Sequence, residues 1–249
     1  MINSFLIALT FLSVIPVPLK FLPEWNEKNL RFFCVMMPAT GILFGIFWLL
    51  FALVLERLEI FSANLRGFVM TLAALILTGG LHMDGLMDSF DAIFSRRGME
   101  TRLKILSDPH AGSFAVIGCV LILMAKTFLF AEIFSQRLSV NFLFFIPVYS
   151  RLGMAVLLNN VKFAKNNGLA VMLGKTRNKR GNFLFIILFL ILAFFNESLI
   201  IPAIFISSLI IWIKICLEIF GGVTGDLLGA FLEISEVLIL TGTVIENCI

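Results

Sequence analysis

The 249-residue chain is 60% hydrophobic and only 14% charged, whereas about a quarter of the residues in an ordinary globular protein are charged. A soluble protein of this size could not remove so much apolar surface from water, so we expect a protein embedded in a lipid bilayer. A net charge of +3 excludes the extended basic face that nucleic-acid binding requires. The four cysteines form no CxxC pair and predict neither a disulfide framework nor a zinc site.

The first apolar run covers residues 5–15. It has no Lys or Arg before it and no small-residue cleavage site after it, so we expect no signal peptide. The run is also too short to cross a bilayer, and Pro16 and Pro18 end it. We predict a short interfacial or re-entrant segment.

Seven later stretches are apolar enough to form membrane-spanning helices. They predict an all-α, polytopic integral membrane bundle. With no internal repeat and no linker of different composition, residues 1–249 are expected to form a single domain. The predicted spans are residues 32–55, 67–81, 112–133, 140–158, 183–195, 199–217 and 227–245.

The Lys and Arg residues between these spans predict an orientation. Alternating the seven spans places thirteen basic residues in the N-terminal stretch and the two large loops, and three on the other side. Because basic loops remain in the cytoplasm, the large loops at residues 84–110 and 161–182 are expected to be cytoplasmic. We therefore predict a multi-pass protein of the cell (inner) membrane with its active site facing the cytoplasm.

The sequence GGLHMDGLMDSFDAIFSRR begins at Gly79 and contains three regularly spaced carboxylates. Asp84, Asp88 and Asp91 recur at i, i+4 and i+7, which places them within an arc of about 60° on a helix. Three like charges on one face repel each other. Mg²⁺ would relieve that repulsion, because it binds carboxylate oxygens together with substrate phosphates. The alternative is a hydrophilic loop whose charges only keep it in water.

Polar residues near these carboxylates are suited to phosphate chemistry. Arg97 and Arg102 offer the forked donors that bind a diphosphate. His82 could act as a general base or as a phosphate donor, and a purely structural hydrogen bond is an equally open interpretation.

A second acidic set follows the sequence GGVTGD, which ends at Asp226. Glu233 and Glu236 lie inside the last predicted span, where each costs about 2–3 kcal/mol on insertion scales. Residues of this kind face a polar cavity, where they bind substrate, or form an ion pair. Lys126 and Arg151, basic residues within two other spans, are the candidate partners. Both interpretations stay open.

Five segments of the chain resemble the cobalamin synthase family, adenosylcobinamide-GDP ribazoletransferase. They occur in the family's order from about residue 11 to residue 240. The segments are FLSVIPVP, PATGILFG, GGLHMDGLMDSFDAIFSRR, RLKILSDPHAG and GGVTGDLLGAFLEISE.

The resemblance implies a Mg²⁺-dependent membrane phosphotransferase of late cobalamin biosynthesis. Such an enzyme joins adenosylcobinamide-GDP to α-ribazole, or to its 5′-phosphate, and releases GMP. Carried over by position, the catalytic residues are His82, Asp84, Asp88 and Asp91. The metal ligands are Asp84, Asp88, Asp91 and Asp226, and the substrate-binding residues are Arg97, Arg102, Asp108, Gly221, Gly222, Thr224, Glu233 and Glu236.

Two other functions compete with this one. A CDP-alcohol phosphotransferase of lipid synthesis also presents aspartates to a metal and a diphosphate, but its Ala-Arg pair and its eight-residue spacer are absent. A secondary transporter would use Glu233, Glu236 and Lys126 as an ion relay. The sequence leaves the choice between ribazole and its phosphate open, and it does not decide whether the chain forms a homo-oligomer.

Overall fold

The computed structural model describes residues 1–165, 169–174, 177, 179–195 and 199–248. Within these residues the regular secondary structure consists of helices, apart from one isolated bridge, which confirms the predicted all-α class. Short 3₁₀ turns cover Leu19–Phe21 and Asn141–Phe144. The α-helices are α1 (Ile2–Leu12), α2 (Glu27–Leu30), α3 (Phe33–Arg57), α4 (Ala63–Thr78), α5 (Leu81–Phe94), α6 (Met99–Ile105), α7 (Ser113–Ser135), α8 (Phe145–Asn160), α9 (Leu169–Gly174), α10 (Lys179–Phe195), α11 (Ile200–Ile219) and α12 (Gly225–Cys248).

The membrane spans can be counted only among the described residues. There, five helical segments are long and apolar enough to cross a bilayer, and the bent pair α4 with α5 makes a sixth if it is counted as one broken span. The predicted span at 183–195 lies in α10, which has 17 residues and ends next to residues outside the described part. The chain is a multi-pass membrane protein, and the count of seven is approximate.

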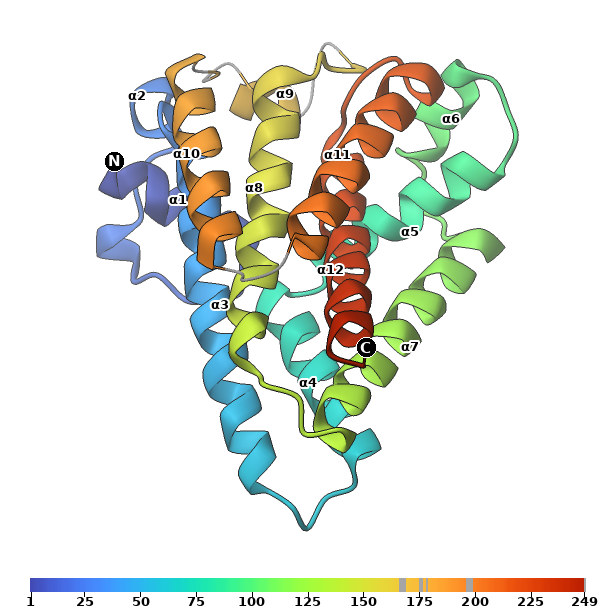
Figure 1. Ribbon diagram of the computed structural model, residues 1–249. Coiled ribbons are helices and arrows are strands. Elements are labelled where there is room, and N and C mark those ends of the chain that lie inside the picture. The colour runs from blue at the N-terminus through green and yellow to red at the C-terminus, as the bar shows by residue number, and fades with distance from the viewer. Residues whose placement is uncertain (166–168, 175–176, 178, 196–198, 249) are drawn as a thin grey trace.

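Two consecutive glycines produce the bend between α4 and α5. Gly79 and Gly80 have φ angles of +63° and +73°, a left-handed conformation that glycine adopts without the steric cost of a Cβ. The two helix axes therefore meet at 94°. As a result, α5 runs sideways next to α12 and lies below α6 in this view (Figure 1).

Helix α12 occupies the middle of the bundle and packs against α5, α7, α8 and α11 (Figure 1). Around it, α3 packs on α8 and α4 packs on α7. The outer faces of the bundle expose large apolar side chains, such as Leu50, Phe128 and Ile211. An apolar outer surface of this kind is suited to lipid rather than water.

The N-terminal run predicted at residues 5–15 forms α1 and the turn after it. Ile7, Ala8 and Leu12 of α1 are fully buried, and the helix packs against α3. After α1, the amide of Val14 donates to the carbonyl of Leu77 at 3.0 Å, so the chain is attached to the end of α4. Entry of this segment into the bilayer stays a prediction.

Candidate functional site

An open pocket of about 340 Å³ lies between α5 and α12, at the end of the bundle where α6 and α9 lie (Figure 1). A volume of this size is typical of small-molecule sites. Its polar lining includes His82, Asp84, Ser107, Lys165, Thr224 and Asp226, and its apolar lining includes Phe11, Leu81, Leu106, Met154 and Val171. Residues that lie far apart in the sequence, from α1 to α12, therefore line one cavity.

A close contact between α5 and α12 brings the two acidic motifs together. A Cβ added to Gly85 would lie 2.8 Å from the carbonyl oxygen of Asp226 and 2.9 Å from its Cα. The two backbones touch only because residue 85 has no side chain. The contact places Asp84 beside Asp226, and both residues line the pocket.

We expect Gly85→Ala to force α5 and α12 apart and to lower the stability of the protein by about 1–3 kcal/mol, the usual cost of overpacking. The thermal unfolding temperature of the detergent-solubilised variant measures this. The matched control is Gly225→Ala at the start of α12, where an added Cβ meets no atom within 4 Å. Equal unfolding temperatures for the two variants would contradict the proposed contact.

The GGVTGD loop is held against the chain that follows α8. The amide of Val223 donates to the carbonyl of Lys162 at 2.8 Å, and the amide of Ala164 donates to the carbonyl of Val223 at 3.1 Å. A Cβ on Gly222 would approach the Lys162 carbonyl oxygen to 2.5 Å, so this approach requires glycine. Gly221, with φ of +74°, forms the turn. Gly221 and Gly222 thus shape the loop, and neither lines the pocket.

Thr224 connects this loop to α12. Its hydroxyl accepts a hydrogen bond from the amide of Leu227 at 3.3 Å, the usual arrangement of a residue that caps a helix N-terminus. It also lies 3.4 Å from the Asp226 carboxylate. Thr224 therefore orients the first turn of α12, which carries Asp226 into the pocket.

The predicted acidic face on α5 is present, but its members have different surroundings. Asp84 is exposed, whereas Asp88 and Asp91 are half-buried. The charges of Asp84, Asp226 and Asp91 all act on Asp88. Within the described residues, no group of three or more His, Cys, Asp or Glu side chains has the arrangement of a metal site.

Asp91 is engaged elsewhere. Its two carboxylate oxygens accept hydrogen bonds from the amides of Gly112, at 2.5 Å, and Ala115, at 2.9 Å. These amides belong to the N-terminus of α7, where a negative charge is favourable. A Cβ on Gly112 would lie 2.6 Å from the carboxylate, so glycine is needed there too. Asp91 therefore caps α7 from another helix, a role that the sequence pattern does not reveal.

His82 belongs to the lining of the pocket between α5 and α12. Its side chain is 1% exposed, and its Nε2 is buried without a hydrogen-bond partner. The backbone of His82 also packs within about 3.2 Å of the position of a Cβ on Gly229. The histidine lines the pocket, and its role as a general base stays a prediction.

The predicted diphosphate donors and Asp108 lie outside the pocket lining. Arg97 is exposed, and Arg102 lies on α6 with a buried Nε that has no partner. Asp108 accepts hydrogen bonds from the amide of His110 at 3.0 Å and from its ring Nδ1 at 2.7 Å. These bonds hold the pKa of Asp108 below its ordinary value, so this carboxylate organises its own turn. Substrate binding by these three residues stays a prediction.

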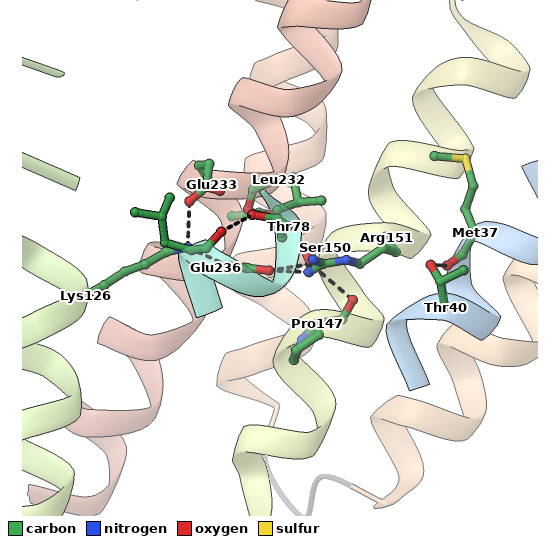
Figure 2. Close-up of polar contacts among 12 residues, drawn as sticks. Met37, Thr40, Thr78, Lys126, Pro147, Ser150, Arg151, Leu232, Glu233 and Glu236 are labelled. Carbon is green, nitrogen blue, oxygen red and sulfur yellow. Dashed lines mark hydrogen bonds and ion pairs between the residues drawn. The ribbon is translucent and has the colours of Figure 1, made fainter. Parts of the chain in front are cut away.

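Glu233 and Glu236 form a buried ion-pair cluster with Lys126 of α7 (Figure 2). The Lys126 Nζ donates to Glu233 at 2.6 Å and to Glu236 at 2.7 Å. All three side chains are at most 6% exposed. This confirms the ion-pair interpretation of the two glutamates. Neither residue lines the open pocket, and their assignment to substrate binding stays a prediction without support from this geometry.

Arg151 of α8 completes the cluster (Figure 2). Its Nη1 donates to Glu236 and to the hydroxyl of Ser150, and its guanidinium lies 4.4 Å from the ring centroid of Phe44. Two positive and two negative charges therefore balance inside the bundle. Since buried charges are tolerated only when they are paired, this cluster joins α7, α8 and α12.

The structure also brings in Ser107 and Lys165, neither of which the sequence singles out as a site residue. Lys165 belongs to the basic loop at 161–182, of which residues 166–168, 175–176 and 178 lie outside the described part. The sequence favours orientation and contact with anionic lipid as the role of this loop, with binding of an anionic substrate as the alternative. No spacing in the sequence connects either residue to the acidic motifs, because the connection depends on the pairing of residues 162–164 with Val223.

Comparisons with known proteins identify relatives over nearly the whole chain. The family model CobS, described as cobalamin-5-phosphate synthase, matches residues 4–244. The adenosylcobinamide-GDP ribazoletransferase of Lachnoclostridium phytofermentans is 31% identical over 95% of this chain and 91% of its own length. The protein of the same name from Pseudomonas putida is 34% identical over 96% of this chain and 97% of its own length.

A third relative, also named adenosylcobinamide-GDP ribazoletransferase, comes from Clostridium perfringens and is 32% identical over 92% of both chains. No solved structure matches the chain. The family match includes both acidic motifs and the residues that line the pocket. The chain therefore belongs to the cobalamin-5-phosphate synthase family.

Proposed function

We propose that the chain transfers the adenosylcobinamide-phosphate group of adenosylcobinamide-GDP to α-ribazole or its 5′-phosphate, with release of GMP. The observation that carries this proposal is the joining of the two acidic motifs at one open pocket, with Asp84 from α5 and Asp226 from α12. Family membership supports the reaction, and the pocket supplies a place for it. The product is adenosylcobalamin or its 5′-phosphate.

The donor groups at the pocket fit Mg²⁺. This ion is usually held by one or two carboxylates together with substrate phosphates, and not by a complete cage of protein ligands. Asp84 and Asp226 supply two carboxylates, and Asp88 lies close enough to interact electrostatically with both of them. When bound, Mg²⁺ would neutralise charge on the diphosphate and on the departing phosphate. We leave Asp91 out of this proposed set because each of its oxygens already accepts a hydrogen bond from α7; its assignment as a metal ligand stays a prediction.

The reaction is a phosphoryl-group displacement. The hydroxyl of the ribazole attacks the phosphorus on the cobinamide side, and the bond from that phosphorus to the bridging oxygen breaks. GMP leaves with the bridging oxygen, and the hydroxyl proton passes to a carboxylate facing the pocket. The residues of the chain hold the two substrates in line, which supplies a large part of the rate enhancement in such reactions.

The position of the pocket supports a cytoplasmic active site. The pocket lies at the end of the bundle that carries the α5–α7 loop and the chain after α8 (Figure 1). Both segments are rich in Lys and Arg, whereas the opposite end carries Arg57, Arg66 and Arg137. Because basic segments remain on the cytoplasmic side, nucleotide substrates would reach the pocket from the cytoplasm.

We expect the purified protein to release GMP from adenosylcobinamide-GDP and α-ribazole when Mg²⁺ is present. Excess EDTA should reduce GMP release to background, and added Mg²⁺ should restore it. A parallel reaction with a CDP-linked lipid tests the rival phosphotransferase, and release of CMP in that reaction alone would overturn the proposal. Folded protein that is inactive in both reactions would favour transport.

A further inference from the structure

Lys165 is the single Lys or Arg among the described residues that line the pocket. The other charged groups of the lining are the carboxylates of Asp84 and Asp226. A diphosphate entering this pocket would be repelled by these two carboxylates. A positive charge in the lining is therefore needed to attract its phosphate oxygens. We propose that Lys165, supported by Ser107, binds phosphate oxygens of the diphosphate substrate. The inference rests on the proposed function and names a binding residue for it.

The position of Lys165 is set by backbone hydrogen bonds. Residues 162–164 pair with Val223 through bonds of 2.8 and 3.1 Å, and Gly222 allows the two chains to lie in contact. Three residues after Val223 comes Asp226. The same pairing therefore fixes Lys165 and the first turn of α12 relative to each other. A lysine held by such a pairing loses less conformational freedom on binding a ligand than one on an unattached loop.

The contacts of Lys165 leave its charge available. Its Nζ donates to the hydroxyl of Ser107 at 2.5 Å, and a hydroxyl is neutral. In the described part of the chain, no carboxylate lies within 4.0 Å of this ammonium group. An ammonium group has three N–H donors, so two remain after the bond to Ser107. The side chain is half-buried, which strengthens its attraction for an anion relative to open water.

Lys165 could instead serve only to neutralise Asp226, whose carboxylate it influences electrostatically. The two roles differ in what they change. A phosphate-binding lysine lowers the KM for the diphosphate substrate and leaves the KM for α-ribazole unaffected. A lysine that only neutralises Asp226 changes kcat or the Mg²⁺ requirement, and it leaves the KM for both substrates unaffected.

The test compares Lys165→Met, Lys165→Arg and Lys104→Met in detergent-solubilised protein. Lys104 is an exposed lysine on α6 outside the pocket lining. We expect Lys165→Met to raise the KM for adenosylcobinamide-GDP about tenfold or more, the loss typical of a charged hydrogen bond. The KM for α-ribazole should stay within about twofold. Lys165→Arg should recover part of the loss, and Lys104→Met should match the wild type.

An unchanged KM for adenosylcobinamide-GDP in Lys165→Met would overturn the assignment, as would an equal rise in the KM for both substrates. Calorimetric binding of GDP to wild-type protein and to Lys165→Met separates this failure from failure of the proposed function. If GDP binds to wild-type protein but not to Lys165→Met, and the wild-type protein shows no turnover, the proposed function is overturned and the role of Lys165 in binding the diphosphate is kept. If GDP binds equally well to wild-type protein and to Lys165→Met, and the wild-type protein releases GMP, the role of Lys165 is overturned and the proposed function is kept.

Discussion

Asp84→Asn should reduce GMP release by about a thousandfold or more, whereas Asp91→Asn should retain most of it. An amide cannot supply the negative charge that a divalent cation and a diphosphate transfer require. Asp84 is exposed to the pocket, so its charge faces the substrate directly. Asp91 faces the amides of α7, and asparagine still offers one oxygen to them. Steady-state rates of GMP release measure the difference.

The expected loss for Asp91 is one of stability. Asp91→Ala removes both bonds to the N-terminus of α7 and should lower the free energy of unfolding by about 1 kcal/mol, as loss of a helix cap usually does. Thermal unfolding of Asp84→Asn should match the wild type, which shows that its inactivity is chemical. If Asp91→Asn loses as much activity as Asp84→Asn, the separation of the two roles is wrong.

Lys126→Met should destabilise the protein by about 3–5 kcal/mol, because it leaves two buried carboxylates without their shared partner. Among the residues that the structure describes, Glu233 then has no ion-pair partner, and Glu236 keeps Arg151 alone. The double variant Lys126→Met/Glu233→Gln restores the charge balance around the remaining pair. It should recover a large part of the lost stability. Unfolding in detergent micelles, followed by circular dichroism, measures both variants.

An exposed ion pair supplies the control. Arg137 and Glu59 lie 3.8 Å apart with side chains 84% and 75% exposed, and such pairs contribute at most about 1 kcal/mol. Arg137→Met should therefore leave the unfolding transition nearly unchanged. A Lys126→Met protein as stable as the Arg137→Met control would show that the buried cluster contributes nothing to holding α7, α8 and α12 together.

Much of the fold follows from local features of the sequence, namely the length of its apolar runs and the spacing of its charged residues. Long apolar runs can satisfy their backbone groups in lipid only as helices, so the sequence by itself determined a helical membrane protein. The spacing of Asp84, Asp88 and Asp91 placed them on one helix, and α5 contains all three. The predicted span at 67–81 ends close to the break before that helix, but the left-handed conformation of Gly79 and Gly80 and the 94° bend are seen only in the tertiary structure.

Only the tertiary structure decided which of the similar acidic residues face the pocket and which form structural contacts. Asp84 and Asp91 look alike in the sequence, but α7 approaches only one of them. Glu233 and Glu236 could have faced substrate, and the crossing of α7 and α8 beside α12 pairs them instead with Lys126 and Arg151. Lys165 reaches the pocket through a bond to a loop about sixty residues away. Helical spacing is a local property, whereas contacts between helices depend on how the whole chain packs.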